Sequence, residues 1–187
     1  AEAGGRDLVY EFASTAKVTF PGSGMAWVAA SDTDIADIRA HFAAMRVCPE
    51  KISQLAHAAF LRDAAGVRAH MRKHADIARP RFELVERKLA EGLDGLGIAS
   101  WTHPRGGYLV LFNGPEGTAM AIVALAKELG VTLTGAGATW PYGADPRDSD
   151  IRIAPTFPSL EALGQALDVF VCAVKLVCAR MERGSRV

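Results

Sequence analysis

A helical stretch of about thirty residues near the middle of the chain constrains the fold most. It runs from about Ala64 to Leu93 and contains Pro80. A proline inside a helix removes a backbone hydrogen bond, so it must kink or break the helix there. Because a kinked long helix is a natural hinge, we expect two domains, residues 1–80 and 81–187.

Short strands and helices flank this stretch on both sides. Before it, β-branched and aromatic residues predict strands over residues 8–13 and 25–30. Ser31 caps a helix over residues 32–45, and Pro49 opens another that runs to about Leu61. After it we expect strands over 98–102, 107–112, 131–134 and 151–154, a helix over 118–129, and a last helix capped by Ser159. The chain is therefore predicted to be α/β.

Composition excludes several functions. Twenty-one basic residues balance twenty-one acidic ones, so we expect neither nucleic acid nor an anionic membrane as a partner. No apolar run approaches the ~20 residues that a membrane span needs. The odd, widely spaced cysteines Cys48, Cys172 and Cys178 predict reduced thiols in a cytoplasmic protein, with the last two as small core residues. Residues 1–6 look like the end of a helix and its turn, without a secretory signal, so we expect a preceding half.

Lys17 is the first candidate for chemistry. It follows a strand and three small residues and precedes the turn Pro21-Gly22-Ser23-Gly24. A lysine that forms a Schiff base must lose its proton, which burial or neighbouring cations promote. The hydroxyls of Ser14 and Thr15 and the amides of Gly22 to Gly24 are suited to a phosphate. The alternative is a solvated lysine at the end of a strand.

Arg152 is the second candidate. In Ile151-Arg152-Ile153 the two isoleucines point to one face of a strand and the arginine to the other. A guanidinium there is suited to binding a carboxylate through two parallel hydrogen bonds. The alternative is an arginine paired with Asp148 or Asp150. His70 and His74 stand one helical turn apart, but basic neighbours and the lack of a third ligand argue against a metal, so we expect no metal there and a solvated helix face instead.

Three motifs together resemble one family. Ser14-Thr15-Ala16-Lys17 with Pro21-Gly22-Ser23-Gly24, Pro104-Arg105-Gly106-Gly107-Tyr108, and Ile151-Arg152-Ile153-Ala154-Pro155 resemble, in order and spacing, the fold type I (class I) pyridoxal-phosphate-dependent aminotransferases. The MocR-like aspartate aminotransferases are the subgroup most similar. The resemblance covers the whole chain and implies the end of the large cofactor domain followed by the small C-terminal α/β domain.

The resemblance assigns roles to residues. Lys17 would form the internal aldimine with pyridoxal 5′-phosphate and move a proton at the substrate α-carbon. Ser14, Thr15, Ser23 and Gly24 would bind the cofactor, and Arg152 would bind the substrate carboxylate. The reaction would be a ping-pong transfer of an amino group, from aspartate or glutamate in our expectation, to a 2-oxo acid, in a homodimer.

The sequence departs from the family pattern at two positions near Lys17. The arginine that the family often carries about eight residues after its lysine is absent, as in the MocR-like subgroup, and Ala16 replaces a common serine. The family's pyridine-binding aspartate and ring-stacking aromatic residue lie upstream of its lysine, so this chain alone should be inactive.

The alternatives are a non-catalytic effector and dimerisation domain of a MocR-type transcription regulator, and a lyase or synthase of the same fold.

Overall fold

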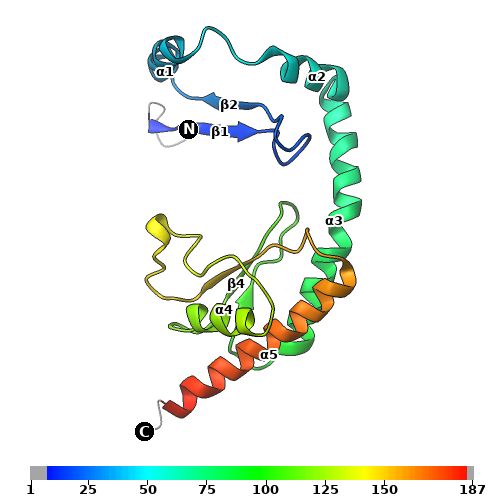
Figure 1. Cartoon of the computed structure of the whole chain (residues 1–187), viewed down its shortest axis with the longest axis vertical. Coiled ribbons are helices and arrows are strands. Elements are labelled where there is room, and N and C mark those ends of the chain that lie inside the picture. Colours follow the sequence, from blue (N-terminus) through cyan, green and yellow to red (C-terminus); the bar gives the residue numbers. More distant parts are fainter. Residues whose placement is uncertain (1–7, 185–187) are drawn as a thin grey trace. The chain divides into compact units, whose positions relative to one another are not determined.

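The computed structural model describes residues 8–184, and the chain divides into two compact units, Ala1–Lys73 and His74–Val187 (Figure 1). The expectations for residues 1–7 lie outside the described residues. The boundary between the units falls inside α3 (Ala64–Leu93), which continues through Pro80 as one helix. Pro80 therefore does not break the helix, and a domain boundary at residue 80 stays a prediction.

The first unit contains a β-hairpin. β1 (Glu11–Ser14) and β2 (Ala26–Ala29) pair in antiparallel fashion, with Ser14 opposite Ala26. Residues 15–25 connect the two strands. Both strands were predicted, although the observed strands are shorter and the first begins three residues later.

Two helices follow the hairpin. α1 (Asp32–Met45) begins as predicted, because the Ser31 side chain accepts a hydrogen bond from the Asp34 amide. α2 (Lys51–Leu61) begins later than predicted. Glu50 caps it, with carboxylate oxygens 2.6 Å from the amides of Ile52 and Ser53, so Pro49 lies before the helix. The hydroxyl and amide of Ser53 hold the pKa of the Glu50 carboxyl below its usual value, which favours the charged cap.

The first unit buries few of its apolar side chains. α1 has no buried residue, and β1 and β2 have none either. Exposed large apolar residues of this unit include Leu8, Phe12, Trp27, Met45, Val47, Ile52 and Leu55. Exposed large apolar side chains in this number are typical of a segment that another part of a protein covers.

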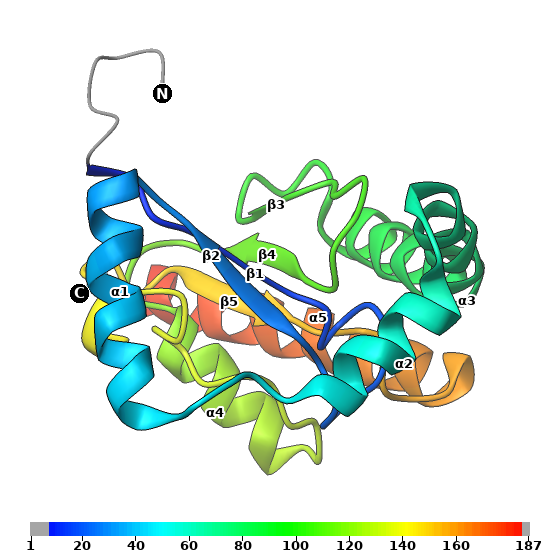
Figure 2. The same ribbon diagram turned by 90° about the horizontal axis from the view of Figure 1, so that it is seen from above.

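The second unit is a three-stranded sheet backed by helices. The strand order is β3 (Ser100–Trp101), β4 (Val110–Asn113), β5 (Asp150–Ile153), all antiparallel. α4 (Ala119–Glu128) and α5 (Leu160–Gly184) lie over the same face of this sheet (Figures 1 and 2). The core unites residues of α3, β4, β5, α4 and α5: Val85, Leu89, Leu93, Val110, Phe112, Ile122, Ile151, Ile153, Leu163, Leu167, Phe170 and Val174.

The second unit corrects three sequence expectations. Residues 131–134 are not a strand; they are an irregular segment that begins with a bond from the Val131 amide to the Ala126 carbonyl after α4. Cys178 is a core residue as expected, but Cys172 is exposed on α5. By length and composition alone, α5 is long and apolar enough to cross a membrane, with a mean hydropathy of 1.8, which the sequence analysis overlooked. In this structure its buried residues belong to the core of the second unit.

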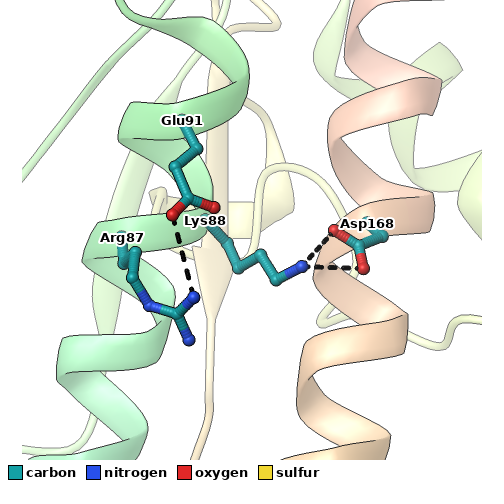
Figure 3. Close-up of polar contacts among 4 residues, drawn as sticks. All are labelled: Arg87, Lys88, Glu91 and Asp168. Carbon is teal, nitrogen blue, oxygen red and sulfur yellow. Dashed lines mark hydrogen bonds and ion pairs between the residues drawn. The ribbon is translucent and has the colours of Figure 1, made fainter.

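An ion pair joins α3 to α5 across this core. The Lys88 ammonium lies 2.6 and 2.8 Å from the two carboxylate oxygens of Asp168 (Figure 3). Arg87 and Glu91, on the outer side of α3, form a looser pair at 3.7 Å. The first pair links two elements and the second stays within one helix turn.

Candidate functional site

Lys17 lies in a tight turn directly after β1. The amides of Val18 and Thr19 donate to the Thr15 carbonyl at 2.8 and 2.9 Å, which folds the chain around Lys17. The Ala16 amide donates to the Ser14 hydroxyl at 3.0 Å. Lys17 is exposed in this chain, and its backbone is held by the residues on both sides of it.

Thr15 fastens the two ends of the loop together. Its amide donates to the Met25 carbonyl, and the Met25 amide donates back to the Thr15 hydroxyl, both at 2.8 Å. The Thr15 side chain is only 6% exposed. Its hydroxyl therefore has internal partners already, and its predicted contact with a cofactor stays a prediction.

Glycine is favoured at two positions of this loop for two different physical reasons. Gly22 has a φ of +84°, a left-handed conformation that favours glycine. Gly24 instead faces Ala16 at close range, since a Cβ on Gly24 would lie 2.9 Å from the Ala16 Cα. The lysine turn and the glycine turn are therefore in direct backbone contact.

A histidine that the sequence analysis gave no role lies beneath this loop. His57 of α2 is 2% exposed, and its Nε2 lies 2.9 Å from the Thr15 hydroxyl and 2.5 Å from the Thr19 hydroxyl. Its Nδ1 lies 2.7 Å from the Ser53 carbonyl oxygen. No motif marked His57; the only sequence signal was a histidine within the otherwise apolar run 55–61.

His70 contacts the same loop from α3. Its Nε2 lies 2.7 Å from the Val18 carbonyl oxygen, and its ring packs edge-on against Phe60 at 5.0 Å between centroids. The expectation that His70 lies on a solvated helix face is therefore wrong. Within residues 8–184, no three histidine, cysteine, aspartate or glutamate side chains are grouped as metal ligands would be.

Arg152 occupies the middle of β5 in the second unit. Ile151 and Ile153 are buried in the core, whereas Arg152 lies on the other face of the strand, as alternation requires. It lines a cavity of about 430 Å³ with residues that include Thr132, Thr134, Ala154 and Phe157. Its Nε is buried and has no hydrogen-bond partner among the described residues.

Asp148 and Asp150, the two suggested partners of Arg152, are engaged elsewhere. The Asp150 carboxylate accepts hydrogen bonds from the Trp140 indole at 2.9 Å and the Ser149 hydroxyl at 3.2 Å. Asp148 accepts a bond from the Met120 amide at 2.9 Å. An unpaired buried guanidinium nitrogen is costly, which is why it marks a place for an anionic ligand.

Asp145 anchors the segment that leads into β5. It accepts hydrogen bonds from the amides of Arg147, Ser149 and Asp150 at 2.8 to 3.0 Å. Desolvation raises the pKa of this carboxyl, but the three amides and the Arg147 charge outweigh that effect, so the net pKa is lowered. The charged carboxylate is thus part of the structure that places β5.

The structure gathers five of the six predicted site residues. Ser14, Lys17, Ser23, Gly24 and the buried Thr15 all belong to the loop of the first unit or its edge. Arg152 belongs to the second unit.

Comparison with known proteins gives consistent matches. A family model described as aspartate amino-transferase matches residues 1–186. A protein of Mycolicibacterium smegmatis described as an aminotransferase is 44% identical over 93% of this chain and 41% of its own length. An aspartate aminotransferase of Corynebacterium glutamicum is 39% identical over 95% of this chain and 41% of its own.

Solved structures agree with the sequence matches. The crystal structure of an aspartate transaminase from Corynebacterium glutamicum has a TM-score of 0.88 and 39% identity, over 92% of this chain and 41% of that one. The multiple substrate aminotransferase of Thermococcus profundus, at 20% identity and a TM-score of 0.78 over 90% of this chain and 41% of that one, shares the fold. The chain thus spans about 41% of the length of the relatives that it matches.

Proposed function

The chain belongs to the aspartate aminotransferase family, and we propose that the protein containing it moves an amino group from an amino acid to a 2-oxo acid. The family match confirms the resemblance to fold type I aminotransferases, and with it the α/β fragment that the sequence predicted. Membership of the MocR-like subgroup stays a prediction. Because the chain spans 41% of its relatives, we further propose that a preceding portion supplies the rest of the active site.

The family implies pyridoxal 5′-phosphate, and the loop at Lys17 fits the reactive and phosphate ends of that group. An exposed amine follows a strand end that carries the Ser14 hydroxyl. The Ser23 hydroxyl and the Gly24 amide belong to the same loop, where the missing side chain of Gly24 permits the close backbone contact with Ala16. Amines, hydroxyls and glycine amides are the groups that an aldehyde and a phosphate need.

Each residue has a defined task in this proposal. Pyridoxal phosphate, when bound, supplies an aldehyde that condenses with amines and a ring that withdraws electrons. Lys17 attaches the cofactor and carries a proton to and from the substrate α-carbon. Ser14, Ser23 and the Gly24 amide bind the phosphate. Arg152 binds the substrate α-carboxylate and so orients the bond that is broken.

The unpartnered Arg152 Nε is the observation that carries the carboxylate assignment. A neutral ligand would leave the charge beside this buried Nε unbalanced, whereas a carboxylate satisfies it with two parallel bonds. Aspartate or glutamate as amino donor and 2-oxoglutarate as acceptor are our proposed substrates. The similarity to the aspartate aminotransferase of Corynebacterium glutamicum supports this choice.

Assembly and location complete the proposal. We propose a homodimer in the cytoplasm. The exposed apolar surface of the first unit supports the need for a covering partner. The three unpaired thiols are in keeping with a reducing compartment.

Reductive labelling tests the proposed function. The protein containing both this chain and the preceding portion would be loaded with pyridoxal phosphate, reduced with borohydride and digested. We expect a phosphopyridoxyl mass on the Lys17 peptide and none in a Lys17→Arg variant. A label on another lysine, or no label, would refute the assignment. Parallel assays of amino transfer to 2-oxoglutarate and of amine elimination separate a transaminase from a lyase, and activity in neither would favour the effector-domain alternative.

A further inference from the structure

Two threonines that flank Lys17 meet on one buried histidine. Thr15 lies two residues before Lys17 and Thr19 two residues after it. Both hydroxyls are within hydrogen-bond distance of the same atom, His57 Nε2, at 2.9 and 2.5 Å. A single nitrogen of α2 therefore contacts the turn on both sides of the lysine.

The hydrogen-bond partner of His57 Nδ1 indicates that this nitrogen carries a hydrogen. The Ser53 carbonyl oxygen can only accept, so His57 Nδ1 must carry a hydrogen to make its 2.7 Å contact. In the neutral ring Nε2 is then an acceptor, to which a threonine hydroxyl donates. The Thr15 hydroxyl already accepts a hydrogen from the Met25 amide, which leaves its own hydrogen to donate.

Further contacts hold the ring in this orientation. Phe20 packs edge-on against His57 at 5.5 Å and tilted against Phe60 at 5.3 Å between centroids. The Thr19 hydroxyl also donates to the Thr15 carbonyl oxygen at 3.2 Å. The same oxygen accepts hydrogen bonds from the amides of Val18 and Thr19. The turn from Thr15 to Phe20 thus contacts the His57 ring through Thr15, Thr19 and Phe20.

We infer that His57 is a positioning residue that fixes the backbone of Lys17 through the single Nε2 lone pair, which the hydroxyls of the flanking Thr15 and Thr19 share as donors. The inference rests on the proposed role of Lys17. Without this acceptor, the buried Thr15 hydroxyl loses a partner and the turn loses its hydrogen-bonded link to α2. The amine of Lys17 then has a wider range of positions, which lowers the fraction of time it spends in a productive geometry.

A purely packing role for His57 makes different predictions from an acceptor role. His57→Gln keeps an amide oxygen the same number of bonds from Cα as Nε2, so it retains the contact with the threonines. His57→Asn keeps a donor near the position of Nδ1 for Ser53 but does not reach the loop. His57→Leu keeps the volume and removes both polar contacts.

Amide hydrogen exchange of the cofactor-free protein, containing this chain and the preceding portion, tests the inference. In His57→Leu and His57→Asn we expect the amides of Val18, Thr19 and Met25 to exchange at least about tenfold faster, with core amides of α5 unchanged. His57→Gln should restore most of the protection. With cofactor, the first two variants should lose kcat more than they change KM. His103→Leu, at an exposed histidine of the second unit, is the control.

Some outcomes would overturn this role. Unchanged protection of the loop in His57→Leu, or equal behaviour of His57→Gln and His57→Leu, would show that the ring only fills space. Should the His57 variants fail to fold, Thr19→Val and Thr19→Ser replace them: valine should deprotect the loop and serine should not, and equal protection in both contradicts the inference. A failure of borohydride labelling at Lys17 is a separate result, because the exchange experiment contains no cofactor.

Discussion

A Cβ atom on Gly24 would lie 2.9 Å from the Cα of Ala16, so these two residues touch through their backbones. The contact joins the turn that carries Lys17 to the turn that carries Ser23. Neither side is a flexible side chain end, so neither can move away without shifting the loop. The contact therefore determines the spacing between the amine and the proposed phosphate-binding groups.

Substitution of Gly24 by alanine should weaken cofactor binding. The added methyl group forces the two turns apart, so we expect the dissociation constant for pyridoxal phosphate to rise about tenfold or more. Titration of the apoprotein followed by absorbance measures this change. Gly135→Ala is the control, because a Cβ there meets nothing within 4 Å. Equal affinity in wild type and Gly24→Ala would contradict the proposed geometry.

Replacement of Arg152 should affect every substrate that carries an α-carboxylate. In Arg152→Ala we expect kcat/KM to fall by a factor of a hundred or more, since losing a desolvated charge pair costs about 3 kcal/mol. Arg152→Lys should recover only part of this loss, because an ammonium group cannot form the two parallel bonds. Steady-state kinetics with aspartate and glutamate measure both effects. Unchanged kinetics in Arg152→Ala would exclude the carboxylate role.

Two tryptophans allow a matched test of buried hydrogen bonds. Trp140 donates to Asp150, which is 8% exposed, whereas Trp101 donates to Glu86, whose side chain is 46% exposed. Trp140→Phe should lower the free energy of unfolding by about 1–3 kcal/mol, because a buried carboxylate loses a partner. Trp101→Phe should cost less, since water can replace the indole at Glu86. Urea unfolding checks the order, and a larger loss in Trp101→Phe would contradict it.

Asp145 should make stability depend on pH. Desolvation raises the pKa of this carboxyl, but the hydrogen bonds from three amides and the Arg147 charge lower it by more. The net pKa therefore lies below the ordinary value of 3.8. A lowered folded-state pKa stabilises the fold above the unfolded-state pKa, and this contribution is lost as the pH falls through the folded-state value. Asp145→Ala should therefore destabilise the protein at pH 7, and its difference from wild type should shrink below about pH 4.

Unfolding midpoints of wild type and Asp145→Ala across this pH range provide the measurement. Glu116→Ala, at an exposed acidic residue of the same unit, is the comparison. A difference between wild type and Asp145→Ala that stays constant down to low pH would mean that ionisation of Asp145 is unimportant.

The ion pairs of Figure 3 should differ in strength. Lys88–Asp168 links two elements with Lys88 23% exposed, whereas Arg87–Glu91 is exposed on both sides. Double-mutant cycles should give a coupling of about 0.5–1 kcal/mol for the first pair and about 0.3 kcal/mol or less for the second. Added salt should reduce both. A stronger coupling in Arg87–Glu91 would contradict the importance of the link between helices.

The helices were predictable because their signals are local. Ser31 and Ser159 stand where the helix caps were expected, and the periodic apolar pattern gave the extent of α1 and α3. Pro49 did not mark the first turn of α2 as predicted. It lies just before the cap, and the Glu50 carboxylate caps the helix instead. Residues 131–134 have strand-forming side chains, but none of the described strands pairs with them, and β5 pairs with β4 alone, so propensity did not decide their structure.

The candidate site was predictable only as separate motifs. The residue order around Lys17 and the alternation around Arg152 could be interpreted from the sequence. The contacts of His57 with Thr15 and Thr19 could not, because they join residues about forty positions apart and depend on how α2 meets the hairpin loop. The unpaired Arg152 Nε likewise depends on where the neighbouring aspartates direct their carboxylates.

The apolar side chains that β1, β2 and α1 leave exposed have a consequence for biosynthesis. If the preceding portion proposed to complete the active site also covers them, that portion leaves the ribosome first and is present when residues 8–61 emerge. The same residues expressed alone would meet only one another, and their uncovered strands and helix should drive aggregation. Recombinant work on this chain therefore calls for co-expression with the preceding portion rather than refolding of the 187 residues by themselves.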